Sequence, residues 1–245
     1  MDLLSLSSVS RAAIRGKNVR PVILLAAILL CAGCATVPPS CPAALPEVFM
    51  QRFAQSLPAN FEAMHSVVIG IKPHWWWPAI RQVALGCSRV DRATRSYHVI
   101  CLSPLGMKLF DVACTNGQVR GAFLFTRQGN QEGMVRALGD AVSRVYLDMT
   151  PGPHATVIRR GDKLIFQQAS GDGRVVYTFS STNALLRSKD YYEGRRRTMT
   201  ITYDNYRPAG DRSFPGSMSL RDYRYGYRLD FVLKEYMDLT NGALP

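Results

Sequence analysis

Residues 227–234 read YRLDFVLK, and the pattern of this run decides the fold class. Apolar side chains occupy every second position from Tyr227 to Leu233, and Arg228 and Asp230 fall between them. Successive side chains of a β-strand point to opposite faces, so the run predicts a strand with one apolar and one polar face. Such a strand is typical of an antiparallel sheet that buries one of its faces.

Outward from this run, further segments share the alternation and the short, turn-bounded length of strands. They lie at 66–71, 80–88, 96–103, 107–114, 119–126, 156–160, 163–169, 174–180 and 197–206, and the quoted run closes a longer stretch at 217–234. Turns such as Gly171-Asp172-Gly173 separate neighbouring runs and predict hairpins. A sheet of about ten or eleven antiparallel strands cannot stay flat, so we expect it to curl.

Two segments instead carry apolar residues at spacings of three and four, which predicts amphipathic helices. The first is Leu45–Leu57, and the second runs from Asn130 to Met149 and ends before Pro151. Two helices can cover the concave side of a curled sheet. The sequence therefore predicts an α+β fold that is mostly β, a curved antiparallel half-barrel of about 10–11 strands with helices on its concave side.

The N-terminus has the layout of an export signal. Four basic residues precede Val22–Leu30, an uncharged apolar run that is far shorter than the roughly 20 residues of a membrane-spanning helix. Cys31-Ala32-Gly33-Cys34 follows and resembles the lipobox of bacterial lipoproteins, with Cys31 where that motif usually has Leu. The resemblance implies cleavage before Cys34 and acylation of Cys34. The alternative is an ordinary signal-peptidase site that leaves Cys34 as a free thiol.

These features divide the chain into a signal peptide at 1–33, a tether at 34–44 and one domain at 45–245. Ala35 stands where lipoproteins kept at the inner membrane usually carry Asp. The resemblance to lipoproteins thus implies a lipid anchor on the periplasmic face of the outer membrane.

The charge of the chain indicates anionic partners. The formal net charge is +12, and removal of 1–33, with four basic residues and Asp2, leaves about +9. Export argues against nucleic acid, so a phospholipid surface is the expected anionic partner. The clearest basic run, Arg195–Arg197 beside Arg187 and Lys189, is expected to be a solvated loop between strands, with attraction to phospholipid as the alternative.

Cysteine usage fits an oxidising compartment, where disulfides persist. If Asp91–Arg95 is a hairpin loop, Cys87 and Cys101 lie on adjacent strands at diagonal positions and share a face, which would allow a disulfide. The alternative is that both are small buried hydrophobic residues.

The sequence shows no motif typical of catalysis or of metal binding. The four histidines are scattered, so no metal site is indicated, and neither a nucleophile elbow nor a phosphate-binding glycine loop occurs. The acids give no spacing that suggests paired acid and base catalysis. We therefore expect a protein that is not an enzyme and that needs no cofactor.

All three tryptophans lie in one run between two prolines: Trp75, Trp76 and Trp77. They could pack as core at one end of the sheet, or lie at the mouth of a ligand cavity. The third interpretation is a loop that enters the membrane interface, where indole rings suit both the apolar and the wet side.

The order of these elements resembles the LolA/LolB superfamily of periplasmic lipoprotein carriers and receptors. The best local matches are Cys101-Leu102-Ser103-Pro104-Leu105-Gly106 with the strand after it, which resembles an uncharacterised lipoprotein family within that superfamily, and Thr200–Tyr206 with the closing hairpin to Lys234. The resemblance covers most of 45–238 and implies a curved sheet and helices that enclose an apolar cavity for acyl chains.

We expect the cavity to be lined by the alternating apolar faces and by the second helix: Tyr97, Val99, Phe110, Met134, Leu138, Val175, Tyr177, Phe179, Ile201, Leu229 and Phe231. The pattern alone does not fix which face of each strand points inward, because a shift of one residue inverts it. The expected function is binding or transfer of an amphipathic lipid or acylated molecule, with a periplasmic carrier or envelope protein as a further partner. The alternative is a structural lipoprotein that holds a protein partner in an envelope complex.

Overall fold

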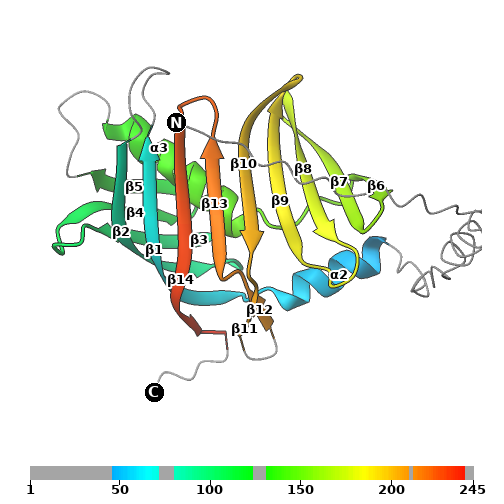
Figure 1. Cartoon of the computed structure of the whole chain (residues 1–245), viewed down its shortest axis with the longest axis horizontal. Helices are drawn as coiled ribbons and strands as arrows, with labels where there is room; N and C mark the ends of the chain where they lie inside the picture. The colour runs from blue at the N-terminus through cyan, green and yellow to red at the C-terminus, as the bar shows by residue number, and fades with distance from the viewer. Residues whose placement is uncertain (1–45, 72–79, 124–130, 210–211, 241–245) are drawn as a thin grey trace, which may run out of the picture. The chain divides into compact units, whose positions relative to one another are not determined.

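The computed structural model describes residues 46–71, 80–123, 131–209 and 212–240 (Figure 1). They all belong to one of the two units into which the chain divides, Ala44–Pro245. The helical elements are α2 (Pro46–Ser56), α3 (Gln131–Val142) and a π-helical turn, η1 (Ser143–Leu147). The strands are β1 (Asn60–Ile71), β2 (Ile80–Asp91), β3 (Ser96–Leu102), β4 (Lys108–Thr115), β5 (Gln118–Phe123), β6 (Thr156–Arg160), β7 (Lys163–Ser170), β8 (Gly173–Ser180), β9 (Leu186–Glu193), β10 (Arg196–Asp204), β11 (Arg207–Ala209), β12 (Arg212–Phe214), β13 (Ser217–Asp222) and β14 (Tyr227–Asp238).

Twelve of the strands form one curved antiparallel sheet in the order β5-β4-β3-β2-β1-β14-β13-β10-β9-β8-β7-β6. Hairpins build it from both sides, and the pairing of β1 with β14 joins the two halves, with Val67 opposite Phe231. The quoted run 227–234 is therefore a central strand. Strands β11 and β12 form a separate two-stranded sheet.

Both helices and the π-helical turn pack on one face of the large sheet, which we call the helix-bearing face (Figure 1). Phe53 of α2 contacts the ring of Phe179 on β8, and Tyr146 of η1 contacts Phe61 on β1. The predicted class, a mostly β fold with a curved sheet and helices on one side, is confirmed.

One strand of the twelve-stranded sheet, β9, was not predicted from the sequence. The region between 180 and 197 was expected to be a loop, but Leu186–Glu193 pairs with β8 and β10 as β9. Its sequence, LRSKDYYE, places a cation at an inward position and so hides the alternation. The predicted solvated loop is thus wrong for Lys189, which lies in this strand with 0% exposure.

The end of the helical segment is held by donors from the sheet. The last carbonyls of a helix have no partner within it, and the ammonium group of Lys189 donates to the carbonyls of Arg144 and Asp148. The Tyr203 hydroxyl donates to the Val145 carbonyl at 2.9 Å, and the Tyr97 hydroxyl to that of Gly139 at 2.9 Å. These contacts fix the helical segment on the sheet through its main chain.

Among the described residues, the unit Ala44–Pro245 has an extensive hydrophobic core. Its larger cluster extends from Phe49 to Leu233 and joins α2, η1 and most strands. Because Ala44–Pro245 is a compact unit with a hydrophobic core, we treat it as a part that folds on its own. Within the described residues, no helix is both long and apolar enough to cross a membrane.

Candidate functional site

The predicted cavity residues on strands share the helix-bearing face. Strand register establishes this, because residues directly opposite in an antiparallel pair point to the same side. Tyr97, which reaches α3, lies opposite Cys114, and Phe231 lies opposite both Val67 and Met218. The same reasoning places all nine on this face: Tyr97, Val99, Phe110, Val175, Tyr177, Phe179, Ile201, Leu229 and Phe231.

These nine residues differ in what covers them. Six are at most 9% exposed and belong to the larger core cluster: Tyr97, Val99, Val175, Tyr177, Phe179 and Ile201. The other three, Phe110, Leu229 and Phe231, are only half-buried. Most of the predicted lining is therefore packed core, and three of the nine side chains keep part of their apolar surface exposed.

The helical segment buries most of its predicted apolar stripe, and Met134 is the exception. α3 buries Val135, Gly139, Ala141 and Val142 and half-buries Leu138, whereas Met134 is 43% exposed. The closest approach is at Gly139, where a Cβ atom would lie 2.6 Å from Val119 Cγ1 and 2.8 Å from the Tyr97 hydroxyl. Glycine thus sets the helix rotation and turns Met134 outward, which corrects its assignment to the interior.

A smaller group of apolar residues lies beside β2, and we call it the second cluster. Its buried members are Val67, Ala84, Cys101 and Leu109, and half-buried Ile69, Phe110 and Phe231 pack against them. On the helix-bearing face three successive positions of β2 carry small residues, Ala84, Gly86 and Ser88, which lie opposite Val67, His65 and Ala63 of β1. We call these three residues of β2 the small-residue strip.

His65 lies between the two clusters. Its side chain is 2% exposed, and its ring centroid lies 6.2 Å from Tyr146, 6.3 Å from Phe214 and 6.0 Å from Phe231. Its Nε2 atom is buried and has no hydrogen-bond partner. Burial lowers the pKa of His65 to about 4, so the ring is neutral near pH 7.

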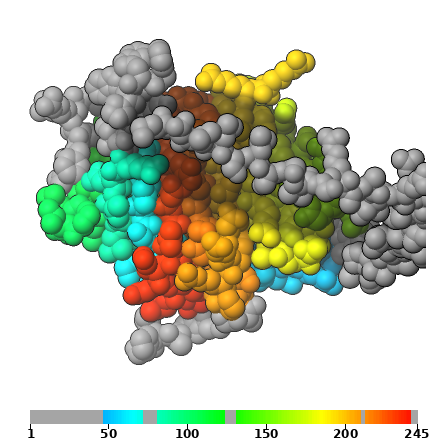
Figure 2. Space-filling model, viewed as in Figure 1, coloured from blue at the N-terminus to red at the C-terminus, as the bar shows by residue number. Residues whose placement is uncertain are grey.

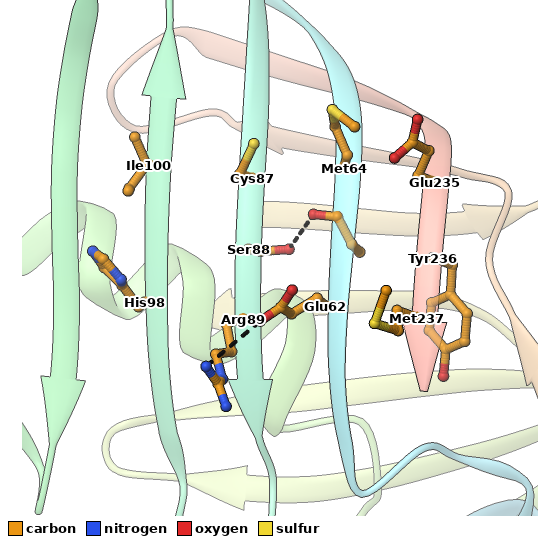
Figure 3. Close-up of a pocket in the computed structure, with 11 residues that line it drawn as sticks. Glu62, Met64, Cys87, Ser88, Arg89, His98, Ile100, Glu235, Tyr236 and Met237 are labelled. Carbon is orange, nitrogen blue, oxygen red and sulfur yellow. Dashed lines mark hydrogen bonds and ion pairs between the residues drawn. The ribbon is translucent and has the colours of Figure 1, made fainter. Parts of the chain in front are cut away.

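The opposite face of the large sheet, which we call the helix-free face, carries a groove of about 640 Å³ (Figure 3). Met64, Cys87 and Ile100 form one row of its lining, across β1, β2 and β3, and Met237 of β14 adds to it. The ion pair between Arg89 and Glu62, 3.6 Å long, crosses its polar end. Figure 2 shows the same side of the molecule in space-filling form.

The two halves of the helix-free face differ in composition. On β9, β10 and β13 the residues Ser188, Thr202 and Ser219 form one hydroxyl-bearing row, as expected of a solvated sheet face. On β1, β2 and β14 the same face also carries apolar side chains, and Val83 and Val232 are 53% and 46% exposed. Neighbouring apolar side chains that stay exposed suggest an interaction surface.

The predicted disulfide is contradicted. Cys87 lies opposite Ile100 and Cys101 opposite Gly86, so the two thiols emerge on opposite faces of the sheet. Both are free cysteines, as is Cys114. The prediction failed because the hairpin places the two cysteines one residue out of step, and side chains that point apart cannot be bridged.

Chemistry other than binding finds little support here. In the ranges that the structure describes, no three His, Cys, Asp or Glu side chains could together hold a metal ion. The strongest polar cluster, His98 with Asp111 at 2.7 Å and Lys108 with Asp111 at 2.7 Å, is an exposed set of ion pairs that lowers the pKa of the Asp111 carboxyl.

Two predicted sites lie outside the described residues, namely Cys34 and the Trp75–Trp77 run. Sequence reasoning missed His65, Lys189 and the small-residue strip. The small-residue strip could have been predicted, since Ala84, Gly86 and Ser88 occupy alternate positions of one predicted strand. His65 was not singled out, because its importance comes from the residues that surround it.

Comparison with solved structures identifies the fold. A LolA superfamily protein from Nitrosomonas europaea superposes with a TM-score of 0.50 at 9% sequence identity, covering 83% of this chain and 96% of that one. An outer membrane lipoprotein-sorting protein domain from Vibrio parahaemolyticus gives 0.47 at 9% identity, covering 79% and 92%. A DUF1329 family protein from Desulfovibrio piger gives 0.47 at 8% identity, covering 78% and 91%.

No family model matches the sequence, and no curated protein matches it. At this level of identity the Nitrosomonas likeness establishes the fold alone. The chain therefore has a LolA-like fold, as the resemblance in the sequence implied.

Proposed function

We propose that this chain of LolA-like fold is a membrane-anchored lipoprotein that binds or transfers an amphipathic lipid or acylated molecule. The acyl chain would lie on the helix-bearing face against the second cluster, and the work would be sequestration, with no bond made or broken. Acylation of Cys34 would hold the protein on the periplasmic face of the outer membrane. A periplasmic carrier or another envelope protein would then deliver or receive the ligand.

The observation that carries this proposal is the uneven cover of the helix-bearing face. Phe110 and Phe231 remain half-buried near the small-residue strip and Leu229 is half-buried on the same face, while the other six predicted strand positions are packed. An acyl chain would remove this apolar area from water, at about 25 cal/mol per Å². Leu138 of α3 would border the same space, and Trp75, Trp76 and Trp77 would contact membrane or ligand.

A pair of substitutions on one strand tests the proposal. Phe231→Glu places a carboxylate on the helix-bearing face, whereas Val232→Glu places the same group on the opposite face of β14. For Ala44–Pro245 we expect methyl decanoate to displace bound bis-ANS from the wild type and from Val232→Glu, but at least tenfold more weakly from Phe231→Glu, because a buried unpaired charge is costly. Equal displacement from both variants, or none from the wild type, contradicts the proposal.

Anchoring is tested separately. Cells that express the full chain would be grown with a clickable fatty acid, and the label should appear on the wild type and disappear from Cys34→Ala. A wild type without label, or a variant that keeps it, rules out acylation at Cys34.

A second candidate, a structural lipoprotein that holds a protein partner, is favoured by the groove on the helix-free face. Its Met64 and Met237 are adaptable apolar side chains of the kind found on protein-binding surfaces. For this function the same two variants should behave in reverse. Val232→Glu would abolish a stable complex in the envelope, and Phe231→Glu would leave it intact.

A further inference from the structure

We infer that His65 is the polar contact for the carbonyl group of an acyl ester or amide bound on the helix-bearing face. This inference rests on the proposed function and specifies its ligand class. It starts from an unusual arrangement, in which a polar ring atom without a partner is buried beside the small-residue strip of β2.

The side chains opposite His65 on the neighbouring strand are small. Across the β1–β2 pair His65 lies opposite Gly86, whose neighbours on that face are Ala84 and Ser88. A Cβ atom built on Gly86 would find only Val67 Cγ2, at 3.0 Å, and the His65 carbonyl oxygen, at 3.9 Å, among the described residues. Tyr146, Phe214 and Phe231 contact His65 with their rings, so a ligand would reach the imidazole over the small-residue strip.

The second cluster leads to this point. Val67 and Ala84 continue the same two strands by one inward position beyond His65 and Gly86, and Phe231 contacts both His65 and the second cluster. An acyl chain on Phe110 and Phe231 would therefore bring one end toward the imidazole. The apolar part of the ligand and its polar group would be recognised by adjacent parts of the same face.

The chemistry of the ring selects the ligand group. A neutral imidazole offers one N–H donor and one acceptor. An ester or amide carbonyl can accept the N–H without bringing a charge into apolar surroundings, whereas a carboxylate would be buried without a counter-charge. The site thus favours acyl esters and amides over free fatty acids.

A purely structural role accounts poorly for the same residue. A histidine kept for stability normally makes hydrogen bonds with its buried nitrogen atoms, because leaving one unpaired costs free energy. Here Nε2 has no such bond, so an aromatic hydrocarbon of similar size should serve the packing at least as well.

The test compares an ester with an alkane of the same length. Methyl decanoate and dodecane would each compete with bis-ANS for Ala44–Pro245, in the wild type, in His65→Phe and in the control His98→Phe, which removes a histidine from the helix-free face. We expect His65→Phe to weaken the ester by about five- to tenfold, as loss of one neutral hydrogen bond predicts, and to leave the alkane unchanged. The control should match the wild type.

Two outcomes overturn the inference in different ways. If ester and alkane both bind and their affinity ratio is the same in His65→Phe, the histidine contact is wrong but the proposed function stands. If neither binds the wild type, both fail. Should His65→Phe not fold, nitrogen NMR of the wild-type imidazole decides, because the Nε2 resonance must shift on adding the ester and stay in place on adding the alkane.

Discussion

Two regions of the helix-bearing face differ in how tightly their apolar side chains are packed. Under α2 and η1, large rings meet edge to face, as Phe53 and Phe179 do at 4.8 Å, and Phe179 has no exposed surface. Beside β2, the small-residue strip leaves Phe110 and Phe231 half-buried. From this comparison we expect stability to be concentrated in the first region, whereas the second leaves apolar side chains only partly covered.

Matched truncations give the largest expected difference between the regions. Phe179→Ala removes a fully buried ring that contacts three other phenylalanines and should cost about 3–5 kcal/mol of unfolding free energy. Phe231→Ala should cost less than about 2 kcal/mol, because its ring is already partly in water. Urea denaturation of both variants measures this, and similar losses would remove the distinction.

Lys189 gives the packed region a pH dependence. Burial lowers its pKa to about 7 from 10.5, so the unfolded chain holds the proton more tightly, and stability should rise as pH increases through this window. Between pH 7 and 9 the gain should be on the order of 2 kcal/mol. Lys189→Met removes the titrating group and should flatten the profile, although it also loses two hydrogen bonds. A variant that keeps the wild-type slope would assign it to another group.

Two glycines offer the finest comparison. Gly139→Ala improves helix propensity, yet its Cβ would clash with Val119 and Tyr97, so we expect a net loss of about 1–3 kcal/mol. Gly86→Ala meets only a methyl group at 3.0 Å and should change stability by less than about 1 kcal/mol. Thermal unfolding of both variants tests the pair, and a stabilised Gly139→Ala would show that α3 is free to shift on the sheet.

Alternation of side chains is a local property, which explains why the sequence predicted so much of the sheet. It located most strands and placed Tyr177 and Phe231 on one common face. β9 was missed because its inward position at Lys189 is charged, and the carbonyls that accept its protons come from 41 and 45 residues away.

The errors at the candidate site share one physical cause, namely that they depend on which strands or helices meet. Whether Cys87 and Cys101 share a face depends on the hairpin register. Whether Met134 points inward depends on the close approach of the helix to the sheet at Gly139. His65 lies in an apolar run, and its unpaired nitrogen and its position opposite Gly86 become evident only once β1 and β2 are paired.

The hydrogen bonds that hold the helical segment have a consequence for how this protein can evolve. Lys189, Tyr97 and Tyr203 all donate to main-chain carbonyls, which every amino acid possesses. Substitutions along Ser143–Leu147 can therefore accumulate without removing an acceptor, provided that the sheet keeps its donors. Attachment of this kind lets a lineage exchange most of its helical side chains while the shape persists, which is compatible with a shared fold at 9% identity.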